Sequence, residues 1–386
     1  MKRISVLGAA MFAAMSLSHA ANANTNGPPT LVNNDRAATE AFWTADSLAK
    51  ANPMPLPVAA NVPFSSEIES APVSQVKVPG GTPTLHATGS AIQLFTPIPR
   101  EEEESIVPEM YGSSGFRFTS SRLVTDAVAN LGGERTYPYA LTGQLTFTVP
   151  AGTTVTPGNY VCSATVQRLG VVTTAGHCVS DGHGHFFTNW KFTPAIRLGS
   201  APYGTWIWRQ VVVTNTWHLG GGGVPNAQDV AVIALFPNSS NVKIGSYTGF
   251  AGFNIPDLYG GQHVSIEGYP CNLDSCAKDH RNDAQVFGGS NNTDVAGSDM
   301  SGGASGGGWI INYGQYASGQ PATGEADTIL LSLVAVTSYG PSNFTPLYLG
   351  ASILDSRYVQ CAPLNTCATS PTAILNYVCV HNPGYC

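Results

Sequence analysis

Charged residues are scarce in this chain of 386 residues. Only 11% of them are Asp, Glu, Lys or Arg, against roughly a quarter in an ordinary soluble protein. Coiled coils and long helical bundles are built from Ala, Glu, Lys, Leu and Arg, so the composition disfavours both. The formal net charge of -7 offers no basic surface for nucleic acid or for an anionic membrane. Hydrophobic residues make up 43% of the chain, which excludes a mostly disordered protein.

Glycine and proline are abundant instead, with 42 and 27 residues. From about residue 137 onward, short β-branched or alternating runs are separated by turn residues, at 141–149, 161–169, 230–235, 264–267 and 330–337. Each run predicts a strand, and this spacing predicts an all-β sandwich or barrel. Only residues 350–360 have a helical pattern.

The N-terminus has the pattern of a cleaved secretory signal. Lys2 and Arg3 precede an apolar run from Ile4 to Leu17, and small residues follow up to Ala23. The run is too short for a membrane anchor, and no later stretch reaches the ~18 apolar residues that a span needs. We therefore expect residues 1–23 to be removed, and the protein to be secreted, with the periplasm as the alternative location and no membrane partner.

Export makes the eight cysteines candidates for disulfide bonds. Their spacing along the chain predicts the disulfide bonds Cys162–Cys178 and Cys271–Cys276. The terminal cysteines could pair in more than one way; they are Cys361, Cys367, Cys379 and Cys386. A zinc site in this tail is conceivable, but none of its cysteines lies in the Cys-x-x-Cys pair that such sites commonly use.

Residues 24 to about 115 differ in composition from the rest. They hold ten acidic and four basic residues, a net charge of -6, and they are rich in Asn, Ala and Pro. We interpret residues 24–120 as a propeptide that restrains or chaperones the remainder, with a flexible extension as the alternative. Glu101–Glu104 and Arg122 are candidate processing regions. The main domain then spans residues 121–360, and residues 361–386 form a cysteine-rich tail.

Three segments combine residues that carry chemistry. His177 lies in Thr173–Cys178, next to a predicted disulfide at the end of a strand, where a general base would be held rigidly. Asp229 opens a strand without other charges, and a buried Asp needs a partner such as a histidine N–H. Ser305 lies among glycines in Ser301–Gly308, where backbone N–H groups can converge on an oxyanion.

Each segment alone is a weak signal, but the order His, Asp, Ser is that of the chymotrypsin-type triad. The separations are 229 − 177 = 52 and 305 − 229 = 76 residues. An esterase of the α/β-hydrolase type is rejected, because its triad runs in the order Ser, acid, His.

The region from about 125 to 360 resembles the chymotrypsin-type serine peptidases, and most of all their bacterial glutamyl-endopeptidase-like branch. Besides the triad segments, the resemblance rests on Tyr137-Pro138-Tyr139, Phe192-Thr193-Pro194-Ala195, Pro202-Tyr203-Gly204-Thr205-Trp206, Gly268-Tyr269-Pro270 and Ser338-Tyr339-Gly340. It implies two packed six-stranded Greek-key β-barrels, about 137–245 and 246–350, with the active site in the cleft between them and a short C-terminal helix. Cys162–Cys178 would brace the histidine loop.

The resemblance also implies the roles of individual residues. Ser305 would be the nucleophile, His177 the general base and then acid, and Asp229 the residue that orients His177. The N–H groups of Gly303 and Ser305 would form the oxyanion hole. Substrate binding would involve Asp299, Thr337, Ser338 and Gly340. The implied function is a secreted serine endopeptidase that acts on polypeptides as a monomer, without a cofactor or metal.

The chain departs from the family pattern at several positions. Ala304 replaces the Asp that captures a new N-terminus in animal digestive members, so any propeptide control works differently. Asp299 stands where trypsin-like enzymes select basic residues, but the adjacent cysteine is absent. Thr337 and Met300 replace residues that favour Glu. These positions leave the cleavage specificity open.

Two further hypotheses concern functions other than catalysis. A catalytically silent protein of the same fold, used for binding, is the alternative to the peptidase. His183 and His185 flank Gly184 after Asp181 and raise the question of a metal site. We favour a surface loop there, because no nearby cysteine or acidic pair completes a ligand set.

Overall fold

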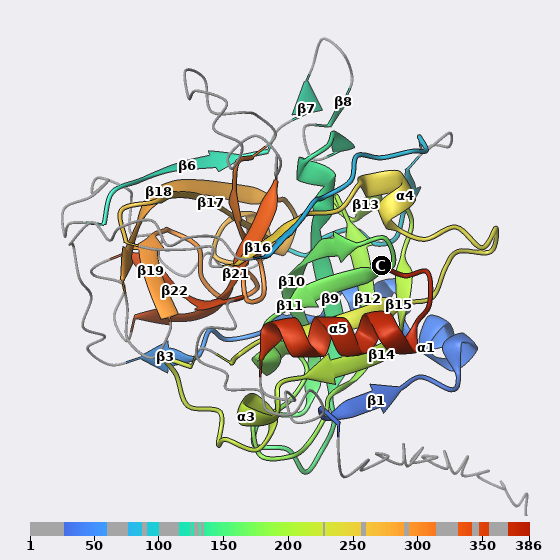
Figure 1. The fold of residues 1–386 in the computed structure, drawn as a ribbon. Helices are drawn as coiled ribbons and strands as arrows, with labels where there is room; N and C mark the ends of the chain where they lie inside the picture. Colours follow the sequence, from blue (N-terminus) through green and yellow to red (C-terminus); the bar gives the residue numbers. More distant parts are fainter. Residues whose placement is uncertain are drawn as a thin grey trace, which may run out of the picture.

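Two closed β-barrels form the centre of the computed structural model (Figure 1). The structure describes residues 27–59, 76–86, 91–99, 116–123, 125–126, 131–132, 135–226, 228–255, 260–288, 293–313, 331–341, 347–354 and 370–386. The predicted signal at residues 1–23 and Glu101–Glu104 lie outside these residues. No helix in the described ranges has both the length and the apolar composition that crossing a bilayer requires.

The first barrel has six antiparallel strands. They are β9 (Thr142–Val149), β10 (Gly158–Arg168), β11 (Val171–Thr174), β12 (Thr188–Pro194), β14 (Trp206–Val213) and β15 (Ala231–Leu235). The ring runs β9-β10-β11-β15-β14-β12 and returns to β9. Aromatic side chains fill it, and the rings of Trp190 and Trp208 meet edge to face, with 5.0 Å between their centroids and an interplanar angle of 76°.

The second barrel has the same number of strands. They are β17 (His263–Gly268), β18 (His280–Gly288), β19 (Thr293–Gly297), β20 (Gly308–Ile311), β21 (Ser332–Pro341) and β22 (Tyr348–Ile353). The ring runs β17-β20-β21-β22-β19-β18 and closes by the pairing of β18 with β17. The predicted all-β class with two six-stranded barrels is confirmed.

A short helix near the C-terminus is also confirmed, but its expected position at residues 350–360 is wrong. Residues 348–353 form the fully buried strand β22, while 355–360 lie outside the described residues. The helix is α5 (Pro371–His381), which packs on β14 and β15 in front of the first barrel (Figure 1). Its start carries clear local signals, because Ser370 caps it and Pro371 occupies its first turn.

The remaining elements are short. The helices are α1 (Arg36–Phe42), α2 (Ala45–Ala49), α3 (Asn215–His218) and α4 (Gly245–Thr248), with 3₁₀ turns η2 (Tyr139–Leu141), η3 (Gly176–Cys178) and η4 (Asp274–Cys276). The strands are β1 (Thr30–Val32), β2 (Asn52–Pro53), β3 (Val58–Ala59), β4 (Val76–Val78), β5 (Ile92–Gln93), β6 (Phe118–Arg122), β7 (Thr125–Asp126), β8 (Leu131–Gly132), β13 (Ser200–Ala201) and β16 (Phe253–Ile255).

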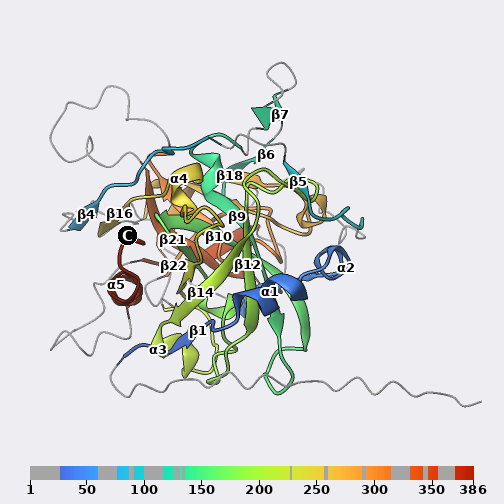
Figure 2. The same ribbon diagram turned by 90° about the vertical axis from the view of Figure 1, so that its right-hand side faces the viewer.

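The described part of the N-terminal segment pairs with strands of both barrels and with two short strands outside them. β1 pairs with β14, β2 with β10, and β3 with β21. Further along, β4 pairs with β16, β5 with β13, and β6 with β18. The helix α1 lies beside β12 and β14 (Figure 2). The described parts of this segment therefore lie against the barrels or against strands beside them.

Candidate active site

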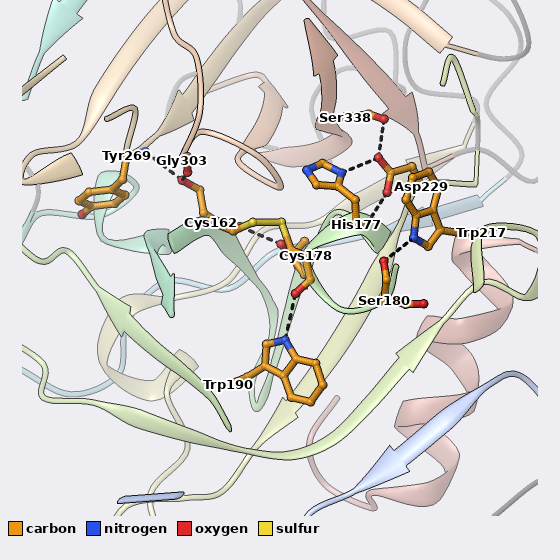
Figure 3. The surroundings of a disulfide bond; sticks show 12 residues. Cys162, His177, Cys178, Ser180, Trp190, Trp217, Asp229, Tyr269, Gly303 and Ser338 are labelled. Atoms are coloured by element: carbon orange, nitrogen blue, oxygen red, sulfur yellow. Dashed lines mark hydrogen bonds and ion pairs between the residues drawn. A yellow bond between two sulfur atoms is a disulfide. The ribbon is translucent and has the colours of Figure 1, made fainter. Parts of the chain in front are cut away.

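His177 lies in the turn η3, directly after β11. Its neighbour Cys178 is joined by a disulfide to Cys162 on β10, with a Cα–Cα distance of 6.3 Å (Figure 3). Gly176 leaves the space that this turn needs, because a Cβ there would lie 2.7 Å from the Trp217 ring and 2.9 Å from Oδ1 of Asp229. The residues before and after His177, Gly176 and Cys178, thus both fix its position.

Asp229 is completely buried and uses both carboxylate oxygens. Oδ1 accepts the backbone N–H of His177 at 2.7 Å, and Oδ2 lies 2.8 Å from Nδ1 of the same residue. The hydroxyl of Ser338 donates a 2.6 Å hydrogen bond to Oδ2 (Figure 3). With Nδ1 donating to the carboxylate, the neutral imidazole keeps Nε2 as a proton acceptor.

Ser305 lies in a turn whose glycines allow conformations that other residues resist. Gly303 and Gly306 have φ values of +94° and +76°, in the region where L side chains are strained. A Cβ at Gly306 would lie 2.0 Å from Oγ1 of Thr174. The N–H of Gly306 donates to the Thr337 carbonyl at 2.8 Å, which holds the turn against β21.

Ser163, on β10, connects this turn to the first barrel. Its backbone N–H donates to the Ser305 carbonyl at 2.7 Å, and its hydroxyl donates to the Gly303 carbonyl at 2.9 Å. The same hydroxyl accepts the N–H of Tyr269 at 2.9 Å. Sequence reasoning missed Ser163, and its only local signal is its position directly after Cys162.

The atoms that would react are buried. His177 is 3% and Ser305 is 0% exposed. Within the described ranges, neither Nε2 of His177 nor Oγ of Ser305 has a hydrogen-bond partner. The structure thus joins His177 and Asp229 by direct hydrogen bonds. It holds Ser305 in a turn that is hydrogen-bonded to the same barrel through Ser163.

A cavity of about 340 Å³ adjoins the turn that carries Ser305. Of the four predicted substrate-binding residues, Asp299 and Gly340 line it. The hydroxyls of the other two form hydrogen bonds within the protein instead. The Ser338 hydroxyl donates to Asp229, and the hydroxyl of the completely buried Thr337 accepts the indole N–H of Trp309 at 3.0 Å.

Asn272 supports one wall of this cavity from the loop closed by the Cys271–Cys276 disulfide. Its Nδ2 donates to the Asp299 carbonyl at 2.8 Å, and its Oδ1 accepts the Ser301 N–H at 2.9 Å. Sequence reasoning did not select Asn272, because nothing local distinguishes it. Among the terminal cysteines, the structure pairs Cys379 with Cys386, while Cys361 and Cys367 lie outside the described residues.

The loop of His183 and His185 is organised by Asp181. Burial would raise the pKa of this carboxyl, but hydrogen bonds from His183, His185 and Thr154 outweigh it and lower the pKa. The donors are the backbone N–H groups of all three residues and Nδ1 of His185. The carboxylate is therefore already used in holding the loop.

Glu267 is a buried acid that sequence reasoning missed. Its backbone carbonyl lies against Gly307 in the turn that follows Ser305. Its carboxyl accepts hydrogen bonds from Tyr313 and, at 2.8 Å, from Thr142 on β9. Burial raises the pKa of Glu267 to about 7, although these hydrogen bonds and the charge of Arg281 oppose the rise.

Many solved structures are similar to this chain, and three proteases are among them. A thermostable serine protease, AL20, from an extremophilic microorganism is 23% identical over 56% of this chain and 92% of its own, with a TM-score of 0.44. The protease Anisep from Arthrobacter nicotinovorans is 24% identical over 61% and 93%, with a TM-score of 0.44. A Glu endopeptidase in complex with MPD is 17% identical over 67% and 95%, with a TM-score of 0.46. No family model and no curated protein matches the chain.

Proposed function

We propose that this chain is a secreted serine endopeptidase that hydrolyses peptide bonds through an acyl-enzyme. The observation that carries the proposal is the set of three donors on Asp229: the N–H and Nδ1 of His177 and the hydroxyl of Ser338. A buried carboxylate arranged in this way fixes the tautomer of His177 and stabilises the imidazolium that forms during catalysis.

In the first half of the reaction, Oγ of Ser305 attacks the carbonyl carbon of the substrate, and Nε2 of His177 takes the hydroxyl proton. The N–H groups of Gly303 and Ser305 stabilise the oxyanion. When the C–N bond breaks, His177 gives the proton to the leaving amine, and the acyl group remains as an ester on Ser305.

In the second half, a water molecule attacks the ester while His177 takes one of its protons. The tetrahedral intermediate then releases the carboxylic acid product, and the proton returns from His177 to Oγ of Ser305. No metal or cofactor is needed in this sequence. The disulfides Cys162–Cys178 and Cys271–Cys276 are consistent with an oxidising, extracellular destination.

The test uses protein secreted and processed by the producing cells. Fluorophosphonate should label Ser305 in this protein, and casein or a peptide library should be cleaved. The variants Ser305→Ala and His177→Ala should be secreted but lose both reactions. Absence of labelling in processed protein that carries Ser305 would reject the peptidase and favour a silent binding protein of the same fold.

A further inference from the structure

Residues 52–59, which we call the strap, lie across the candidate active site. The N–H of Met54 donates to the Val161 carbonyl on β10 at 2.9 Å. The Met54 carbonyl accepts the N–H of Gly303 at 3.2 Å, and the Pro57 carbonyl accepts the N–H of Gly340 on β21 at 3.0 Å. The strap therefore passes from the first barrel, over the turn that carries Ser305, to the second barrel.

The strap also covers the cavity beside Ser305. Its residues Pro53, Pro55, Leu56 and Val58 are part of the lining of that cavity. Met54 is only 5% exposed and packs in the core of the first barrel, whereas Leu56 packs against the core of the second. A polypeptide substrate cannot reach Gly303 and Gly340 while the strap occupies their N–H groups.

The direction of the strap differs from that of a substrate that can be cleaved. His177 must give a proton to the leaving amine, so the C-terminal half of a substrate has to pass on the side of His177. A ring nitrogen of His177 lies within 4.8 Å of the sulfurs of Cys162 and Cys178, which tie that side to β10. The acyl half then lies along β21.

The strap runs the opposite way. Its N-terminal end pairs in parallel with β10, with Asn52 opposite Tyr160, and its C-terminal end pairs in parallel with β21, with Val58 opposite Gly340. The nitrogen that follows the Met54 carbonyl belongs to Pro55 and leads towards β21, away from the side of His177. Proton transfer to this nitrogen is therefore blocked by geometry.

We propose that the strap is an autoinhibitory segment that occupies the substrate path in reverse and is not cleaved there. This inference rests on the proposed function and adds its regulation. The Met54 carbonyl takes the place of the substrate oxygen on Gly303, without a leaving group that His177 can protonate. Activation then requires a cut outside residues 52–59, followed by departure of the strap.

The first experiment uses the full-length secreted chain. In the variant Met54→Gly/Leu56→Gly, the strap loses the two side chains that pack on the cores of the two barrels and keeps its prolines. We expect fluorophosphonate to label Ser305 at least about tenfold faster than in the parent. This factor corresponds to a loss of about 1.4 kcal/mol in the free energy that holds the strap in place. The matched control is Leu85→Gly/Ile92→Gly, two exposed residues of the same N-terminal segment, which should label at the parent rate.

A second measurement does not depend on catalysis. In the Ser305→Ala background, hydrogen exchange of the peptides that contain Gly303 and Gly340 should accelerate in the strap variant and stay unchanged in the control. If the double variant is poorly secreted, Met54→Gly alone should show the same direction in both measurements. Mass spectrometry of the parent, incubated with processed enzyme, should find residues 52–59 intact.

The outcomes separate the two proposals. A parent chain that labels as fast as processed protein, unchanged exchange in the strap variant, or Ser305-dependent cleavage between residues 52 and 59 would overturn the reverse, inhibitory strap. Faster exchange without labelling of any form, processed protein included, would instead reject the peptidase and with it the inhibition.

Discussion

The hydroxyl of Ser163 on β10 donates a 2.9 Å hydrogen bond to the carbonyl oxygen of Gly303, in the turn that precedes Ser305. A residue of the first barrel thus positions the backbone that would bind the oxyanion in the second. The same hydroxyl accepts the buried N–H of Tyr269, so its removal leaves two backbone groups without their partner.

The variant Ser163→Ala should therefore affect both stability and turnover. We expect a loss of about 1–3 kcal/mol in the free energy of unfolding, because buried polar groups lose their hydrogen bonds. With the Gly303 N–H displaced, kcat should fall about tenfold or more while KM changes little. Thr165→Val on the same strand is the control, because the Thr165 hydroxyl has no partner among the described residues. Equal kcat in the two variants would contradict this role.

Ser338→Ala tests whether Ser338 acts on Asp229 or on the substrate. Loss of its 2.6 Å hydrogen bond to Oδ2 leaves the carboxylate with only the two bonds of His177. We expect kcat to fall about tenfold with an unchanged KM, because the carboxylate then holds His177 less firmly. A raised KM at unchanged kcat would show that Ser338 serves substrate binding instead.

The disulfide Cys162–Cys178 should contribute to activity as well as stability. Its sequence separation of 16 residues corresponds to about 3 kcal/mol of loop-closure stabilisation. We expect Cys162→Ala/Cys178→Ala to lower both Tm and kcat, because His177 loses its brace. The matched variant is Cys379→Ala/Cys386→Ala, which removes the bridge between α5 and the C-terminal residue. It should lower Tm but leave kcat unchanged, and an equal loss of kcat would refute the specific role.

Glu267 should make stability fall as pH rises. Its pKa is about 7 in the folded protein against 4.5 as the ordinary value. The folded state therefore binds more protons than the unfolded state between pH 4.5 and 7, so this stabilisation is complete below pH 4.5 and is lost through pH 7. The difference of about 2.5 corresponds to a loss on the order of 3 kcal/mol.

The variant Glu267→Gln keeps the shape of the side chain and its acceptor for Tyr313 but cannot ionise. Its Tm should change less between pH 5 and pH 8 than that of the parent chain, and should exceed the parent Tm at pH 8. Differential scanning fluorimetry across this range measures both. Parallel Tm curves for the two proteins would show that Glu267 does not govern the pH dependence.

The barrels could be predicted from the sequence because each strand has its own local pattern and turn residues. His177, Asp229 and Ser305 could be selected because each lies in a distinctive segment of a few residues. The helical pattern of residues 350–360 is misleading because residues 348–353 form a short, fully buried strand, and such a strand has little hydrophobic periodicity. The start of the helix is indicated in the sequence by Ser370 and Pro371, a typical N-cap residue followed by a proline of the first turn.

Other parts of the site depend on contacts between segments far apart in the chain. Ser163 meets Gly303 across 140 residues, and Ser338 meets Asp229 across 109. Local patterns contain no information on such pairs. The placement of Met54 on Gly303 is of the same kind, since it follows from the path of the N-terminal segment over both barrels.

The alternating prolines of the strap determine how firmly it is held. Pro53, Pro55 and Pro57 have no N–H, so every second residue of this segment is unable to donate to a neighbouring strand. A regular β-strand in the same place would form a continuous ladder with both barrels and dissociate slowly. The strap instead follows a preset extended path with few donors, which suits a reversible closure that opens once the chain is cut elsewhere.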